Sequence, residues 1–380
     1  MVTVAPYDLA PLASIALVGA ALALGPVWWV WRRERGQGAE QRAAARLRAL
    51  TVLTLCLTFD LVLFGAYTRL TDSGLGCPDW PGCYGQSSPL GAHAQISAAQ
   101  SELPEGPVTH GKAWIEMTHR YLATGVGALI VVLAVLSWIE ARRGSAKLSP
   151  WWAGATLLWV CIQGAFGALT VTMKLYPLIV TLHLLGGMVL LVLLAVQVAR
   201  ASVIRIALPR SLWFGALAIA VLSALQIALG GWVSTNYAVL ACSGFPSCQG
   251  SWWPQMDFEH GFALLRELGS AKDGGALPFA ALTAIHYVHR LVAYVLLLAM
   301  AVFAWRLHAH GLTRPWASAT AGIALWQLAS GLSNVVLGWP LLGAVAHTAG
   351  AAAWVTLLTL LIAGAQAVPE TAFRRMHAFP

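Results

Sequence analysis

Four histidines in long apolar segments are the residues of this sequence best suited to carry chemistry. His119 and His289 each precede an arginine, and His183 and His347 each begin a His-x-x-Gly motif. An ionisable side chain is costly inside a bilayer, so an intramembrane histidine indicates a function by default. Two histidines on neighbouring helices, present twice, predict two sites in which a haem iron has two axial histidine ligands.

The depths of the histidines agree with this hypothesis. His119 and His183 each lie about 6 residues inside the predicted outer end of their segments, or roughly 9 Å at the rise of an α-helix. His289 and His347 have similar predicted depths. The alternative is that all four are buried histidines that form hydrogen bonds between helices. Zinc is not favoured, because no group of three or four ligands shares one depth.

The composition predicts an all-α polytopic membrane protein. Of the 380 residues, 58% are hydrophobic and 10% are charged, against about 25% charged residues in soluble domains. The net charge of +8 (23 − 15) comes from basic residues in short loops between apolar segments. This pattern is typical of membrane orientation and excludes a nucleic-acid-binding face.

About nine segments are long enough to span the hydrocarbon layer. They are 9–31, 49–69, 113–138, 151–173, 177–199, 211–235, 279–305, 315–337 and 342–366. The positive-inside rule places the basic loops and the C-terminus in the cytoplasm and the N-terminus outside. The two long loops, 70–112 and 236–278, which contain paired cysteines, are then extracytoplasmic.

The two halves of the chain repeat in direct order. Loop residues recur at a spacing of 165, the His-Arg pair at 170, and several helix residues at 164. The pairs are Gly65/Gly230, Cys77/Cys242, Pro81/Pro246, Cys83/Cys248, Gly85/Gly250, His119/His289, Arg120/Arg290, Gln163/Gln327, Gly167/Gly331, His183/His347 and Gly186/Gly350. The sequence therefore predicts two parallel four-helix bundles. The expected parts are an extra helix with a basic linker (1–48), an N-terminal half (49–200), a C-terminal half (201–366) and a cytoplasmic tail (367–380).

The repeat differs three residues before the His-Arg pair, where Glu116 in the first half corresponds to His286 in the second. Residues i and i+3 share a helix face, so Glu116 is expected on the side of His119. A carboxylate there is suited to proton transfer. The alternative is a glutamate near the membrane interface. His286 is either a spare ligand or, as we favour, a group that supports a ligand.

Two further sets of residues have open roles. Cys77/Cys83 and Cys242/Cys248 lie in the extracytoplasmic loops, where disulfides persist; both pairs are expected to be structural staples, or the first to be redox-active. Arg120 and Arg290 either neutralise haem propionates or pair with groups in the other half.

Residues 257–268 are expected to form an amphipathic helix over the second site, with Phe258, Phe262 and Leu265 inward.

The sequence resembles the haem A synthase family over residues 50–366. The resemblance rests on the segment Gly65-Ala-Tyr-Thr-Arg-Leu-Thr-Asp-Ser-Gly-Leu75, the loop Cys77-Pro-Asp-Trp-Pro-Gly-Cys83, the motif Glu116-x-x-His119-Arg120 and the duplicated halves. It implies oxidation of one methyl group of haem O, by successive hydroxylations, to the formyl group of haem A.

The resemblance also implies roles for the residues. The substrate haem would bind between His119 and His183, and a haem b cofactor between His289 and His347. Glu116 matches the catalytic carboxylate and Cys77/Cys83 the extracytoplasmic cysteine pair of the family, while Cys242–Cys248 would be a structural disulfide. The family analogy suggests the bacterial inner membrane, with haem O synthase and cytochrome oxidase assembly factors as partners. A homo-oligomer is left open.

Three other functions compete with this interpretation. The main one is a membrane electron-transfer cytochrome with two b haems that it does not modify; Glu116 and the family resemblance argue against it. A transporter is less favoured, because no inverted repeat or broken helix is evident. A disulfide-exchange enzyme would not need four intramembrane histidines.

Overall fold

The computed structural model describes residues 10–33, 38–144, 149–201, 206–309 and 313–369. The chain divides into two compact units, Met1–Leu175 and Tyr176–Pro380. This division precedes the predicted boundary between residues 200 and 201. The difference arises because helix α6 (Pro177–Ala201) packs against helices α7 and α11, both of which belong to the second unit. From residue 370 onward, the predicted tail lies outside the described residues.

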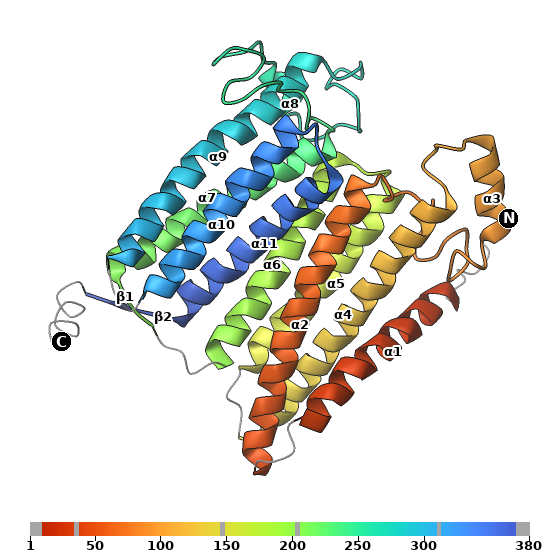
Figure 1. Ribbon diagram of the computed structural model, residues 1–380. Coiled ribbons are helices and arrows are strands. Elements are labelled where there is room, and N and C mark those ends of the chain that lie inside the picture. The colour runs from red at the N-terminus through yellow and green to blue at the C-terminus, as the bar shows by residue number, and fades with distance from the viewer. Residues whose placement is uncertain (1–9, 34–37, 145–148, 202–205, 310–312, 370–380) are drawn as a thin grey trace. The chain divides into compact units, whose positions relative to one another are not determined.

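The first unit is built around one long central helix, α4 (His110–Arg142). Three other helices pack against it: α1 (Ala10–Arg33), α2 (Ala39–Leu70) and α5 (Pro150–Thr172) (Figure 1). The short helix α3 (His93–Glu102) contacts α4 from the loop that joins α2 to α4. Helix α4 begins at Thr109, whose hydroxyl accepts a hydrogen bond from the Lys112 N–H, as is usual for an N-cap residue.

The second unit contains a four-helix bundle and α6. The bundle helices are α7 (Arg210–Thr235), α9 (Phe279–His308), α10 (Arg314–Val336) and α11 (Leu341–Gly364). Helices α9 and α11 both pack against α7 and α10, so they lie across the bundle from each other. Strand β1 (Ile206–Pro209) pairs in parallel with β2 (Ala365–Val368) at the end of the bundle opposite helix α8 (Phe258–Gly261) (Figure 1).

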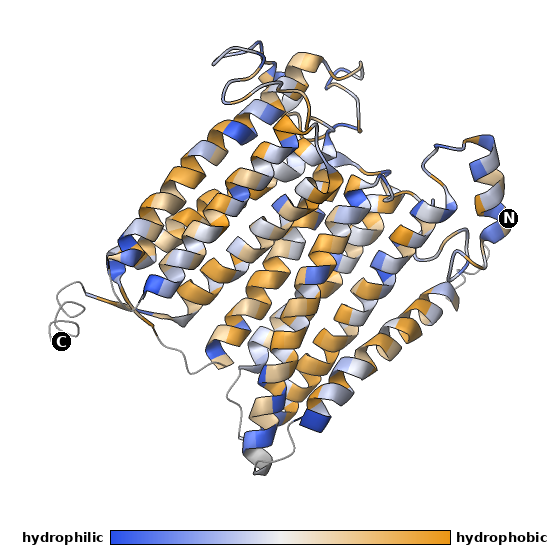
Figure 2. Ribbon diagram, viewed as in Figure 1, coloured by the Kyte–Doolittle hydropathy of each residue, from blue (hydrophilic) through white to orange (hydrophobic). Residues whose placement is uncertain are grey.

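The long helices confirm a multi-pass membrane protein. Eight helices among the described residues are long and apolar enough to cross a bilayer. Hydrophobic residues cover most of their length, and hydrophilic residues gather at their ends and in the loops (Figure 2). The ninth expected span, 315–337, forms α10 at the predicted place, but this helix is not among the eight.

One local prediction is wrong. The segment 257–268 forms only the four-residue helix α8, capped by Asp257, instead of a longer amphipathic helix. The Leu265 side chain is 82% exposed and Phe258 is 45% exposed, so neither points into a core. The Asp257 carboxylate accepts hydrogen bonds from the backbone N–H and the ring Nδ1 of His260, which lowers the pKa of Asp257 and caps the beginning of α8.

Helix α1, which lies outside the sequence repeat, is held against α4 by a close backbone contact. A buried stripe of α1 residues faces the unit: Pro11, Ile15, Gly19, Ala23 and Val30. At Gly19, a Cβ atom would lie 2.4 Å from Thr124 Cγ2 and 2.7 Å from the Thr124 carbonyl carbon. Glycine is therefore required for the two helices to approach this closely.

We predict that Gly19→Ala destabilises the first unit, while Gly25→Ala on the same helix does not. The added methyl at position 19 forces the helices apart, at a cost of about 1–3 kcal/mol, whereas nothing lies within 4 Å of a Cβ at position 25. Thermal unfolding of the purified variants in detergent measures the difference. Equal Tm values for the two variants would contradict the packing described for α1.

Candidate functional site

The carboxylate of Glu116 is buried at the junction between α4 and the first cysteine loop. The Glu116 side chain is 5% exposed, and its Oε2 accepts a hydrogen bond of 2.8 Å from the backbone N–H of Cys77. Cys77 and Cys83 form a disulfide with a Cα–Cα distance of 4.8 Å. The loop also approaches α4 closely at Gly76, where a Cβ would lie 2.4 Å from the Lys112 carbonyl carbon. Glu116 thus anchors the start of the loop.

Arg120 anchors the rest of the same loop. Its Nη2 forms an ion pair with Glu116 Oε1 at 2.5 Å. Its Nη1 donates hydrogen bonds to the carbonyl oxygens of Asp79, Pro81 and Gly82. The guanidinium therefore pairs with Glu116 and holds the loop backbone, and its role as a partner of a haem propionate stays a prediction.

The second unit repeats this arrangement with one substitution. Cys242 and Cys248 form a disulfide with the same Cα–Cα distance of 4.8 Å. Arg290 donates hydrogen bonds to the carbonyl oxygens of Cys242, Gly244 and Ser247. In place of the glutamate, His286 Nδ1 accepts the hydrogen bond from the backbone N–H of Cys242, at 3.2 Å.

Glu116 and His286 occupy equivalent positions, and comparing them distinguishes the side chain's role in holding the loop from its role in supplying a negative charge. Either side chain can accept the N–H of the first loop cysteine, so holding the loop does not require a carboxylate. What Glu116 adds is a negative charge paired with Arg120 inside the membrane-spanning region. The prediction that His286 supports its unit instead of binding metal agrees with its hydrogen bond to the loop.

Three of the four histidines, His119, His289 and His347, have a glycine facing the imidazole. A Cβ on Gly65 of α2 would lie 3.0 Å from His119 Nε2, and the His119 ring lies nearly parallel to that of Phe64. In the second unit, a Cβ on Gly230 would lie 3.0 Å from His289 Cε1, and a Cβ on Gly331 would lie 3.2 Å from His347 Cε1. The three rings therefore pack directly against glycines, and a methyl group at any of these positions would press on the imidazole.

His289 and His347 both belong to the second unit. They lie on α9 and α11, which face each other across the bundle. Ser330 Oγ lies 3.0 Å from His347 Nδ1. The amide Nε2 of Gln226 lies 3.0 Å from His289 Nδ1. Both rings are thus held through Nδ1, and both are only half-buried.

His119 and His183 belong to different compact units. His119 is on α4 of the first unit, and His183 is on α6 of the second. Both side chains are half-buried. Their pairing around one haem stays a prediction that rests on the repeat with His289 and His347.

Comparison with known proteins identifies the family. A family described as "Cytochrome oxidase assembly protein" matches residues 48–360. A protein of Shewanella oneidensis named heme A synthase is 37% identical over 320 residues, which cover 83% of this chain and 95% of the relative. The chain belongs to the haem A synthase family. Residues 1–47, which include α1, lie outside the family match.

More distant relatives agree with this membership. A heme A synthase of Methylobacterium radiotolerans is 28% identical, over 85% of this chain and 91% of the relative. A heme A synthase of Alkalihalophilus pseudofirmus is 27% identical, over 76% of this chain and 87% of the relative. The family match covers both repeats, from the beginning of the first to α11. The family resemblance predicted from the cysteine loop and the Glu-x-x-His-Arg motif is therefore confirmed.

Sequence reasoning singled out the four histidines, Glu116 and both cysteine pairs, but it missed two groups that contact the histidines. The glycines that face the rings include Gly65, Gly230 and Gly331, whereas Gly350, expected to admit a macrocycle, packs against Trp326 and Gln327 of α10. The second missed group is Gln226. The signal that identifies Gly65 and Gly230 is their place in the repeat, one helix before each His-Arg pair.

We predict that Arg120→Met lowers the stability of the first unit by about 3 kcal/mol or more, because it leaves the buried Glu116 carboxylate without its cation. Adding Glu116→Gln to this variant recovers part of the loss by removing the unpaired charge. Thermal unfolding of the single and double variants in detergent measures both effects.

The matched control is Arg290→Met with and without His286→Gln. No carboxylate pairs with Arg290 among the described residues, so the second substitution should give no recovery there. Equal recovery in both units, or none in either, would show that the Glu116–Arg120 ion pair does not stabilise the loop in the way proposed.

Proposed function

We propose that this membrane protein is a haem A synthase that oxidises a methyl group of haem O, by successive hydroxylations, to the formyl group of haem A. Family membership over both repeats supports this reaction. The observation that carries it is the asymmetry between the units. A buried carboxylate lies one helical turn from His119 in the first unit, and an imidazole takes its place in the second.

The substrate haem is held by His119 and His183, as the repeat with His289 and His347 suggests. The His119 ring packs against Gly65, which has no side chain to displace it. Glu116 lies on the same face of α4 as His119, three residues earlier. The substrate therefore has both a ligand and a carboxylate from one helix.

Glu116 is the proton-transfer group in this proposal. The first hydroxylation gives a hydroxymethyl group and the second a geminal diol, which loses water to give the formyl group. Each hydroxylation removes two electrons, which pass to an electron acceptor, and moves protons at the reacting carbon and its oxygen. A positioned carboxylate typically contributes 10²–10⁴-fold to such steps. The Cys77 N–H and the Arg120 guanidinium fix the orientation of the carboxylate, so the disulfide loop positions the catalytic group.

The second unit holds haem b between His289 and His347. The residues fit this group, because Ser330 Oγ can accept the Nδ1–H of His347. That hydrogen bond leaves the Nε2 lone pair for the iron. The Oε1 atom of Gln226 has no partner among the described residues. If the Gln226 amide turns so that Oε1 accepts the Nδ1–H of His289, the Nε2 lone pair of His289 is likewise left for the iron. When bound, haem b supplies a one-electron redox centre.

The orientation in the membrane follows from the distribution of basic residues, and the location and partners follow from the family. The basic loops and the C-terminus face the cytoplasm, the cysteine loops face the outside, and the membrane is the bacterial inner membrane. Haem O synthase, which makes the substrate, and cytochrome oxidase assembly factors are the expected partners. The alternative of a cytochrome that leaves both haems unmodified receives no support from the relatives, which are named for the synthesis of haem A.

We expect Glu116→Gln to retain haem but to abolish methyl oxidation. The amide still accepts the hydrogen bond from Cys77, so the loop and the haem site persist, while the proton-transfer group is lost. Extraction of the pigments from the purified variant, followed by chromatography and mass identification, measures haem O, hydroxylated haem and haem A. Glu140→Gln on the same helix is the control. A wild-type yield of haem A from Glu116→Gln would refute the catalytic role.

We expect His289→Ala and His347→Ala each to remove haem b without unfolding the protein. Loss of one of two axial ligands weakens binding of the iron, but the bundle core of α7, α9, α10 and α11 remains intact. Pyridine haemochrome spectra give the haem b content, and thermal unfolding reports on the fold. His308→Ala, at the end of α9, is the control. Unchanged haem b in both ligand variants would exclude this site.

A further inference from the structure

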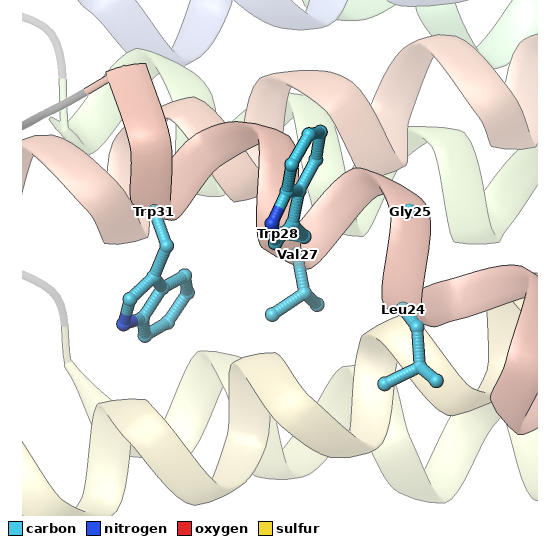
Figure 3. A pocket seen from close by; sticks show the side chains of 5 residues that line it. All are labelled: Leu24, Gly25, Val27, Trp28 and Trp31. Atoms are coloured by element: carbon cyan, nitrogen blue, oxygen red, sulfur yellow. The ribbon is translucent and has the colours of Figure 1, made fainter.

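The C-terminal half of α1 carries an apolar groove that has no role in the proposed haem chemistry. The groove has a volume of about 600 Å³ and is lined by Leu24, Gly25, Val27, Trp28 and Trp31 (Figure 3). The Leu24, Val27 and Trp31 side chains extend to the same side of the helix. No Cβ contact within 4 Å would form at Gly25, so the space beside this residue is free.

Guanidinium groups surround the same end of α1. Three arginines stack over three tryptophans, with 4.7–5.1 Å between the guanidinium carbon and the ring centroid: Arg32 over Trp28, Arg33 over Trp29 and Arg46 over Trp31. Arg46 comes from α2, and its Nη2 also donates to the carbonyl oxygen of Trp31. The first turns of α2 thus meet the last turn of α1 at a cationic and aromatic cluster.

The cluster has more positive charge than its own segment can neutralise. Residues 31–48 contain six arginines and two glutamates, so four guanidinium charges remain even if both glutamates form ion pairs. Within the described residues, the Nε atom of Arg46 is buried and has no hydrogen-bond partner. A buried donor without a partner is costly, and an anionic acceptor would satisfy it.

We propose that this groove is a binding site for one anionic phospholipid. An acyl chain occupies the apolar surface of Leu24, Val27 and Trp31, and the phosphate interacts with Arg32, Arg33 and Arg46. Arginine is suited to phosphate because it presents several N–H donors in one plane. Tryptophan and arginine are also the residues that recognise the lipid head-group region.

Charge selects this occupant over a second copy of the chain. A symmetric contact between two α1 helices through the groove would bring two clusters, each with an excess of four positive charges, close together. An anionic lipid removes that repulsion instead of doubling it. The site lies outside the residues matched by the haem A synthase family, so it adds a property to this chain that does not depend on the proposed reaction.

The test compares lipid retention by the full-length protein. The chain is purified in detergent, incubated with phosphatidylglycerol or with phosphatidylcholine of the same acyl chains, and analysed by native mass spectrometry. The wild type should retain one phosphatidylglycerol more tightly than phosphatidylcholine. Arg32→Gln/Arg33→Gln/Arg46→Gln should weaken phosphatidylglycerol binding by about a hundredfold, since each arginine at the membrane surface contributes about fivefold.

Two further variants separate the groove from charge in general. Gly25→Phe fills the groove and should reduce retention of phosphatidylglycerol although every arginine remains. Arg142→Gln/Arg306→Gln/Arg314→Gln removes the same charge from other loops and should leave retention unchanged. If the triple variant of the cluster does not fold, Arg32→Gln/Arg33→Gln, which changes only exposed side chains, provides the measurement.

Several outcomes would overturn the site. They are equal retention of the two lipids by the wild type, equal loss of phosphatidylglycerol in the control triple variant, and full retention in Gly25→Phe. A dimer that becomes a monomer in Gly25→Phe would instead assign the groove to a second copy of the chain. None of these measurements depends on haem oxidation, so a failure here leaves the proposed reaction standing.

Discussion

The structure depends on the hydrogen bonds that two buried arginine side chains donate to backbone carbonyl groups. Arg120 and Arg290 lie within the membrane-spanning helices α4 and α9, where an unsatisfied cation would be very costly. Each is satisfied by backbone carbonyl oxygens of a disulfide loop. The disulfide keeps those carbonyls turned toward the helix. Loop, arginine and helix are therefore one structural unit, and the adjacent histidine is held in register with it.

Gene duplication explains why this unit occurs twice, and the differences between the copies explain a division of labour. The N–H of the first loop cysteine needs an acceptor, and a carboxylate or an imidazole serves equally well. This tolerance allows one copy to carry Glu116, with a charge suited to proton transfer, while the other carries His286. The structural requirement is the same in both units, so the chemistry was free to diverge.

The histidines meet a different constraint, which is space. An imidazole that binds iron must fit between helices and be held in a fixed orientation. Gly65, Gly230 and Gly331 allow the rings to pack closely, because a single methyl group at any of them would press on the ring. In the second unit, Ser330 and Gln226 hold the rings through Nδ1. Gln226 corresponds in the repeat to Leu61, so this support is specific to the second unit.

The sequence by itself determined the membrane class, the positions of the long helices, the duplication, the disulfides and the candidate ligands. These properties depend on hydropathy, on spacing and on matching residues, all of which are local or can be counted along the chain. Charge patterns in the basic linker were also visible, although they did not indicate a groove.

Only the tertiary structure decided which groups satisfy one another. It assigned Arg120 and Arg290 to carbonyl groups 38 to 48 residues away, packed Gly350 against α10, reduced the segment 257–268 to one turn, and joined α6 to the second unit. Such partners are chosen by the burial of polar groups in three dimensions. A hydrogen bond between distant segments leaves no periodic trace in the sequence, and hydropathy is the same whichever neighbour a helix packs against.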